Sequence, residues 1–258
     1  MPADQRLAKH QRHLRVSCTY YAQEMLRGPR EAPYSGRFLV GEHHEEWDDV
    51  LDMSRRVCVL APRDHGKSFV FSFAFPLWMA EKYPGEIGYI FSSTQPQANK
   101  FLRIIKAEVE TNPKLAHLMP SDRKRWSETE ITLANGHTII AAGFGTRVRG
   151  GHPRWVVCDD VLNDEDAWSE LQRMRNIDYF FSAITNMVVP DGYLVTVGTP
   201  FSSTDLYAEL ARNSEYLFRR YPAIRADGKA LWPARYSMAR LAAKRREIGS
   251  VRFTREFM

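Results

Sequence analysis

The 258-residue sequence has few cysteines and no long apolar segment. Its three cysteines, Cys18, Cys58 and Cys158, do not have the spacing of metal ligands, which argues against a cysteine-bound metal and favours reduced thiols of an intracellular protein. The most apolar stretch, residues 69–80, is too short to cross a bilayer and contains Pro76, and no apolar secretory segment stands at the N-terminus. We therefore expect a soluble, intracellular protein without a membrane partner.

The sequence also lacks internal repeats and low-complexity tracts, and its hydrophobic content of 44% and charged content of 26% are those of an ordinary globular protein. The formal net charge of +5 fits a protein that binds a polyanion but does not require one. The length is sufficient for one large domain, or for one domain with a small appendage.

The segment APRDHGKS at residues 61–68 is the most informative motif that is present. It follows the apolar run 57–60 and matches a Walker A phosphate loop with Ala61 in place of the first glycine. Such a loop turns its backbone N–H groups around a phosphate chain, Lys67 brings positive charge to the β- and γ-phosphates, and the Ser68 hydroxyl is a ligand for Mg²⁺. The motif predicts ATP and Mg²⁺ as cofactors, and the alternative is a surface turn that happens to contain Gly-Lys-Ser. The expected nucleotide-binding residues are Pro62, Arg63, Asp64, His65, Gly66, Lys67 and Ser68.

Apolar strands alternate with helical segments along the chain. Strands are expected at 56–60, 87–91, 155–158 and 193–197, a helix at 97–111 and a hairpin within 131–140 around Asn135-Gly136. This alternation predicts an α/β fold of the P-loop ATPase class (RecA/ASCE-like), with a mostly parallel sheet covered by helices on both faces. Pro76 should kink the helix that begins at Gly66.

Composition changes along the chain suggest three parts. Residues 1–35 are read as an N-terminal helical arm and residues 36–210 as the P-loop ATPase core. Residues 211–258 are more basic and less apolar, and we expect a small helical lid or linker there rather than more of the sheet.

A second acidic strand is needed to hold Mg²⁺ and orient water, and residues 155–160 supply it. Asp159 is the expected metal residue together with Ser68, and Asp160 is placed to act as the general base. Hydrolytic members of this class usually have glutamate where Asp160 stands, so either the local backbone compensates for the shorter side chain or Glu165 takes that role. The alternative for the segment is a strand that ends in a solvated acidic turn.

Arg63 lies inside the phosphate loop. Its guanidinium could stabilise charge that develops on the γ-phosphoryl group, as an arginine finger does, or it could form a structural salt bridge. The predicted catalytic residues are thus Asp160, Arg63 and Lys67.

Four segments in this order resemble the large terminase subunit of tailed bacteriophages: 62–68, 143–150, 156–160 and 197–200, followed by a tail from Leu231 to Phe257. The resemblance implies a viral DNA-packaging motor that hydrolyses ATP to translocate double-stranded DNA into a capsid. It further implies contacts with a portal protein and a small terminase subunit, a homo-oligomeric ring on the capsid or a monomer in isolation, and location in the host cytoplasm. Because the chain stops at the segment that would join a nuclease domain, we expect no nuclease activity from it.

The resemblance also implies roles for single residues. Arg63 matches the arginine of the family's variant Walker A, and Gly198-Thr199-Pro200 matches its coupling motif, in which Thr199 would sense the γ-phosphate; a plain turn after the strand is the alternative. The family's adenine-binding segment corresponds to residues 38–47, where His43, His44 or Trp47 offers a polar or stacking contact, although the family's glutamine is missing.

Arg147 and Arg149 would touch DNA, act on a neighbouring subunit's ATP or be solvated, with a slight preference for the subunit interface. Two other functions compete with the packaging motor. A superfamily 2-like helicase or translocase would need a second RecA-like domain, for which residues 201–258 are too short. A non-hydrolysing nucleotide-dependent assembly protein would be compatible with aspartate at position 160.

Overall fold

The computed structural model describes residues 3–28, 36–147, 151–163, 169–199 and 203–258, and these contain one seven-stranded sheet in the order β3-β4-β2-β5-β6-β1-β7. All neighbouring strands are parallel except the β3–β4 pair. The α/β fold with a mostly parallel sheet is therefore confirmed. The strands are β1 (Arg56–Leu60), β2 (Ile87–Ser92), β3 (Glu130–Thr132), β4 (Thr138–Gly143), β5 (Trp155–Asp159), β6 (Tyr193–Gly198) and β7 (Leu217–Arg220).

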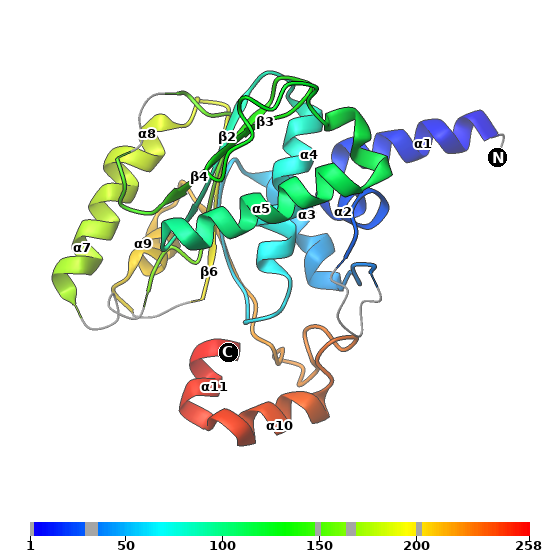
Figure 1. Ribbon diagram of the computed structural model, residues 1–258. Coiled ribbons are helices and arrows are strands. Elements are labelled where there is room, and N and C mark those ends of the chain that lie inside the picture. Colours follow the sequence, from blue (N-terminus) through cyan, green and yellow to red (C-terminus); the bar gives the residue numbers. More distant parts are fainter. Residues whose placement is uncertain (1–2, 29–35, 148–150, 164–168, 200–202) are drawn as a thin grey trace.

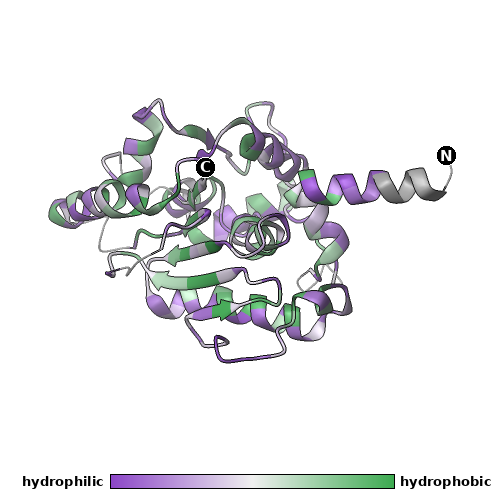
Figure 2. Cartoon of the chain, turned by 90° about the horizontal axis from the view of Figure 1, so that it is seen from above, coloured by the Kyte–Doolittle hydropathy of each residue, from purple (hydrophilic) through white to green (hydrophobic). Residues whose placement is uncertain are grey.

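Helices cover both faces of the sheet, with α4 and α5 on one side and α7 and α9 on the other (Figure 1). Hydrophobic residues gather on the strands in the interior, while α1 projects away from the body (Figure 2). The helical segments before β5 are α1 (Ala3–Val16), α2 (Cys18–Met25), α3 (Glu42–Met53), the π-helix η1 (Phe69–Ala74), α4 (Phe75–Lys82), α5 (Gln95–Thr111) and the 3₁₀-helix η2 (Pro113–Leu118). Those after β5 are α7 (Glu170–Tyr179), the π-helix η3 (Phe180–Ile184), α8 (Thr185–Met187), α9 (Leu206–Arg212), α10 (Met238–Ile248) and α11 (Ser250–Phe257).

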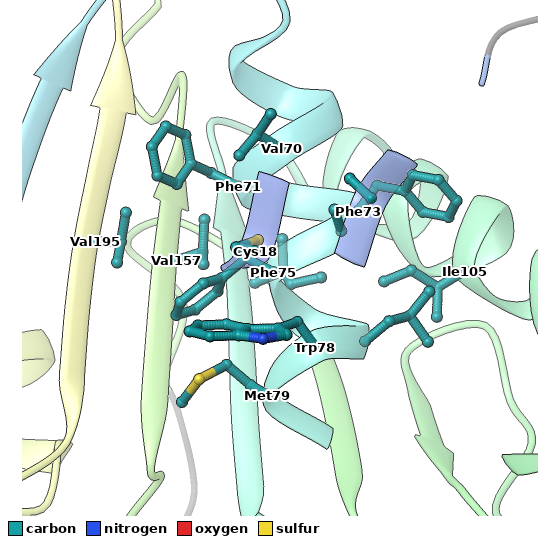
Figure 3. Close-up of a cluster of buried hydrophobic side chains, with 14 of the residues drawn as sticks. Cys18, Val70, Phe71, Phe73, Phe75, Trp78, Met79, Ile105, Val157 and Val195 are labelled. Carbon is teal, nitrogen blue, oxygen red and sulfur yellow. The ribbon is translucent and has the colours of Figure 1, made fainter. Parts of the chain in front are cut away.

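Alternate residues of the strands enter two separate cores. Val57 and Val59 of β1 belong to the larger core, whereas Cys58 and Leu60 belong to the smaller core on the opposite face. Figure 3 shows part of the larger core, where the segment after the phosphate loop packs between the sheet and residues of α2 and α5. Burial on both faces explains why these strands read as continuous apolar runs.

The helix after the phosphate loop changes character just before Pro76. In η1 the hydrogen bonds span five residues, and the Phe75 N–H donates to the carbonyl of Val70. The helix returns to α geometry at Phe75, so that Pro76, which has no N–H to donate, falls in the first turn of α4. The irregularity expected at this proline therefore takes the form of a π-helical segment.

The predicted strands and the hairpin are confirmed, with β2, β5 and β6 each one residue longer than expected. Two expectations need correction. The tail contains β7, which pairs with β1 as an additional strand of the main sheet, and its half-exposed sequence Leu-Phe-Arg-Arg explains why the apolar pattern missed it. The segment 1–35 is not a separate arm along its whole length, since Cys18, Tyr21 and Ala22 of α2 lie in the larger core.

The C-terminal segment has a small core of its own. Tyr236, Leu241, Phe253 and Phe257 pack together with Ala223 and Ala230, apart from the two cores of the sheet. Figure 1 places α10 and α11 beyond one end of the strands. Within the described residues, no helix is both long and apolar enough to cross a membrane.

Candidate nucleotide-binding site

Three of the segments singled out in the sequence meet at the carboxyl edge of the sheet. The phosphate loop follows β1, Asp159 ends β5 with Asp160 next to it, and Gly198 ends β6 with Thr199 next to it. Strand β6 lies between β1 and β5 and is parallel to both. Because ligands of open α/β sheets bind beyond the carboxyl ends of the strands, this edge is the candidate site.

Lys67 is buried, and its ammonium group donates three hydrogen bonds. Nζ lies 2.6 Å from the carbonyl oxygen of Ala61, 3.3 Å from that of Pro62 and 3.2 Å from Oγ1 of Thr199. The loop lysine thus contacts the residue that follows β6.

Asp159 is fully buried, and its two carboxylate oxygens have different surroundings. Oδ2 accepts a 2.5 Å hydrogen bond from the Ser72 hydroxyl, whereas Oδ1 is buried without a hydrogen-bond partner among the described residues. Burial, and then the charge of Asp160, raise the pKa of Asp159 to about 7, while hydrogen bonding from Ser72 and Ser68 and the charge of Lys67 oppose the shift.

These residues fit Mg²⁺. An unpartnered carboxylate oxygen and a nearby serine hydroxyl are hard oxygen donors, and Mg²⁺ at such sites takes one or two protein groups and completes its shell with water and substrate phosphates. The described part of the chain contains no group of three or more His, Cys, Asp or Glu arranged to hold a metal. Asp159 and Ser68 would be the protein ligands.

Asp160 has a left-handed backbone, with φ of +44°, which is unfavourable for a residue other than glycine. Two hydrogen bonds hold it: its N–H donates to the carbonyl of Val197 at 2.9 Å, and its Oδ1 accepts from the Thr199 N–H at 3.1 Å. Strained backbone kept in place by its surroundings is common at active sites. Thr199 therefore contacts both Lys67 and Asp160, and joins the phosphate loop to the acidic strand end.

A cavity of about 410 Å³ opens beside these groups, and its lining includes Arg63, Ser92, Gln97, Asp160 and Thr199. Asp160 is thus accessible from the cavity, whereas Asp159 lies behind it in the core. This is the arrangement expected of a metal-holding residue beside a water-activating one. The alternative base, Glu165, lies outside the described residues, as do Arg149 and Pro200; Arg147 is exposed.

Arg63 forms an ion pair with α11. Its Nη1 lies 3.4 Å from Oε2 of Glu256, and its backbone N–H donates to the Glu256 carbonyl at 3.1 Å. The Arg63 side chain is 72% exposed, so it remains accessible from the solvent. Of the two alternatives considered for Arg63, the structure shows the ion pair and also places the residue on the cavity wall.

The C-terminal subdomain makes two further contacts with the loop. The Tyr236 hydroxyl donates to Oδ2 of Asp64 at 3.2 Å, and the Tyr236 ring stacks on His65 with 5.0 Å between ring centroids. Asp64 also has a left-handed backbone, with φ of +60°. The segment read as a lid or linker therefore rests directly on the phosphate loop.

The residues of α3 that were expected to contact adenine are not available to do so. His43, His44 and Trp47 are fully buried, and the ring Nε2 atoms of His43 and His44 lie 3.2 and 3.0 Å from the carbonyl oxygen of His65. Helix α3 runs behind the loop, so these side chains support it from inside and present no free face to a base. Sequence reasoning also missed Ser72, whose signal was a lone hydroxyl four residues after Ser68 within an apolar run.

Comparison with known proteins points to large terminases. A family model described as the terminase large subunit, T4likevirus-type, N-terminal region matches residues 58–176, which span both the phosphate loop and Asp160. Residues 58–176 therefore resemble the N-terminal region of the large terminase subunit. A curated relative, the terminase large subunit of Enterobacteria phage T3, is 22% identical over 240 residues, which cover 80% of this chain and 41% of the relative.

Solved large terminases share the fold. The HK97 bacteriophage enzyme aligns with a TM-score of 0.64 and 16% identity, over 94% of this chain and 54% of that one. The ATPase domain from Thermus phage P74-26 gives 0.55 and 17%, over 79% and 87%. The large terminase of a thermophilic bacteriophage, solved in complex with ATP-γ-S, gives 0.52 and 13%, over 80% and 47%. The chain thus spans less than half of the T3 relative and about half of the HK97 enzyme, and nearly all of the isolated P74-26 ATPase domain.

Proposed function

We propose that this chain is the ATP-hydrolysing motor domain of a DNA-packaging terminase, with ATP and Mg²⁺ bound at the phosphate loop. The observation that carries the proposal is the position of Thr199, which contacts the loop lysine and the candidate base at once. A non-functional Gly-Lys-Ser turn would have no reason to meet an acidic strand end through a third residue. The complexes of the thermophilic bacteriophage terminase with ATP-γ-S and ADP support a nucleotide as the ligand.

In the proposed reaction, Lys67 exchanges its loop carbonyls for the β- and γ-phosphates of ATP. Ser68 and Asp159 would hold Mg²⁺, which would neutralise charge on the phosphate oxygens. A water in the cavity attacks the γ-phosphorus, the bond from that phosphorus to the bridging oxygen breaks, and ADP leaves. Asp160 accepts the proton of the attacking water, held in position by the Thr199 N–H. Arg63 stabilises charge on the γ-phosphoryl group.

The same contacts provide a route by which ATP hydrolysis would be coupled to movement of the C-terminal segment. Thr199 would register loss of the γ-phosphate through its bond to Lys67, and the loop would pass the change to α11 through Arg63 and Glu256. In this scheme the moving part is the small core of Tyr236, Leu241, Phe253 and Phe257, since β7 belongs to the main sheet.

The partners belong to the same proposal: double-stranded DNA, a portal protein and a small terminase subunit in the host cytoplasm, with the chain in a homo-oligomeric ring. The family match supports them. A superfamily 2-like helicase is less well supported, because the family model and the solved structures that match are those of large terminases.

The test is phosphate release from ATP, measured with and without Mg²⁺ and duplex DNA over a range of protein concentrations. The expected result is Mg²⁺-dependent release that Lys67→Ala reduces by about 100-fold or more, because one preorganised charge is lost at the phosphates. Lys100→Ala, an exposed lysine on α5, is the matched control. Nucleotide binding without release would favour the assembly-protein alternative, and unchanged release by Lys67→Ala would remove the site assignment.

A further inference from the structure

We propose that His43 and His44 are positioning residues that orient the His65–Gly66 peptide of the phosphate loop toward the nucleotide phosphates. This inference rests on the proposed function, since it assigns the two histidines a part in binding at that site. It replaces the adenine contact expected from the sequence with a different role for the same side chains.

Both imidazole rings contact one atom, the carbonyl oxygen of His65, through Nε2 at 3.2 Å for His43 and 3.0 Å for His44. The two residues are adjacent in the first turn of α3, and both are fully buried. A carbonyl oxygen has two lone pairs, so it can accept from both rings.

The cap of α3 determines which nitrogen of His44 carries the proton. Nδ1 of His44 accepts a 2.8 Å hydrogen bond from the Gly41 N–H, so the hydrogen of the neutral ring is on Nε2 and is donated to His65. Burial, and for His44 also the charge of His43, lower the pKa of both rings, that of His43 to about 3, which keeps them neutral. The helix cap and the loop contact are thus made by one tautomer of His44.

The orientation of the next N–H follows from peptide geometry. A trans peptide is planar and its C=O and N–H point in opposite directions, so holding the His65 carbonyl against α3 turns the Gly66 N–H away from α3. Gly66 has φ of +88°, and a Cβ at this position would lie 2.6 Å from Nε2 of His44. Glycine is therefore required here both by the backbone conformation and by the ring that holds the peptide.

The experiment compares variants that keep or remove the donated N–H. Glutamine places an amide N–H near the position of Nε2, so His43→Gln and His44→Gln keep the donor. His43→Leu removes it, and His44→Asn removes it while keeping an acceptor for the helix cap. His137→Leu is the matched control. His137 is also fully buried and contacts a backbone carbonyl, that of Tyr83, but it lies at the amino end of β4, whereas the phosphate loop lies at the carboxyl ends of the strands.

The dissociation constant for ADP, measured by calorimetry, and the melting temperature are the readouts. We expect His43→Leu and His44→Asn each to weaken ADP binding about threefold to tenfold, as loss of one buried hydrogen bond would, and the glutamine variants to restore it. His137→Leu should lower the melting temperature without changing ADP affinity. Equal ADP affinity in the wild type and the donor-free variants would overturn the inference, whereas failure of the wild type to bind ADP would overturn the proposed function instead.

Nuclear magnetic resonance of the wild-type chain decides the question if the donor-free variants do not fold. With ¹⁵N-labelled histidine and glycine, His44 should show the tautomer protonated on Nε2, and the Gly66 amide should shift on addition of ADP. A proton on Nδ1 of His44, or a Gly66 amide that does not respond to ADP, would contradict the proposed role.

Discussion

The phosphate loop is held from two sides by contacts of different kinds. On the α3 side, two neutral histidines donate to one backbone carbonyl, and both are fully buried. On the C-terminal side, Arg63 pairs with Glu256 across an exposed surface, and Tyr236 bonds Asp64. Buried hydrogen bonds between neutral groups keep a loop in one shape, whereas an exposed ion pair contributes only about 0–1 kcal/mol and exchanges readily. The α3 contact therefore suits a fixed cradle, and the C-terminal contact suits a part that moves during the cycle.

The largest expected effect concerns the residue that neither side touches. Asp160→Asn should leave ADP affinity nearly unchanged, because the amide oxygen can still accept from the Thr199 N–H. It should lower phosphate release by about 10²–10⁴-fold, because the proton acceptor is gone. Phosphate release and ADP calorimetry on the same preparation check this. Retained hydrolysis would move the base elsewhere, with Glu165 as the first candidate.

Arg63→Ala tests the mobile side of the comparison. The turnover number should fall far more than ATP affinity, by about tenfold or more, because a guanidinium that acts on the γ-phosphoryl group matters most in the transition state. Arg212→Ala is the matched control, since Arg212 is also an exposed arginine paired with a carboxylate, that of Glu209 at 3.3 Å, but does not line the cavity. If affinity falls and turnover does not, Arg63 is a structural residue.

The two sides also differ in how far the sequence could predict them. Walker A and the acidic strand end are local patterns, so roles for Lys67, Ser68 and Asp159 can be proposed from the residues alone. The roles of His43 and Glu256 depend on which distant segments meet the loop, and Glu256 is far from Arg63 along the chain. No periodicity within α3 reveals that its first turn lies behind a carbonyl of another segment.

The edge strand β7 is a second feature that the sequence alone did not predict. Its residues are half-exposed or exposed, so it lacks the continuous apolar run by which β1 and β6 were recognised. Pairing with β1 places it in the sheet, and that pairing uses backbone groups that carry no side-chain signal.

Lowering the pH should reduce the free energy of unfolding, because His43 on α3 is neutral in the folded chain. His43 has a folded-state pKa of about 3 against an ordinary value of 6.5, so the unfolded chain binds the proton first as the pH falls. The stability due to this residue is complete above pH 6.5 and is lost progressively from there down to about pH 3, with about 2 kcal/mol lost by pH 5. Urea unfolding at pH 7 and pH 5 should therefore show a pH dependence smaller by about that amount in His43→Leu than in the wild type. Equal dependence would mean that His43 is not held neutral in the fold.

The smallest effect is expected from the exposed pair on the other side. Glu256→Gln should change the free energy of unfolding by less than about 1 kcal/mol, because the Arg63 side chain is 72% exposed and its attraction to the carboxylate is screened by water and salt. The backbone hydrogen bond from the Arg63 N–H to the Glu256 carbonyl remains in this variant, so α11 should stay docked. Urea unfolding of wild type and variant in about 0.05 M and about 0.5 M salt measures the difference, which should shrink at the higher salt concentration. A loss of several kcal/mol that does not depend on salt would show that the C-terminal contact is as permanent as the α3 contact, and the distinction between a fixed and a moving support of the loop would fail.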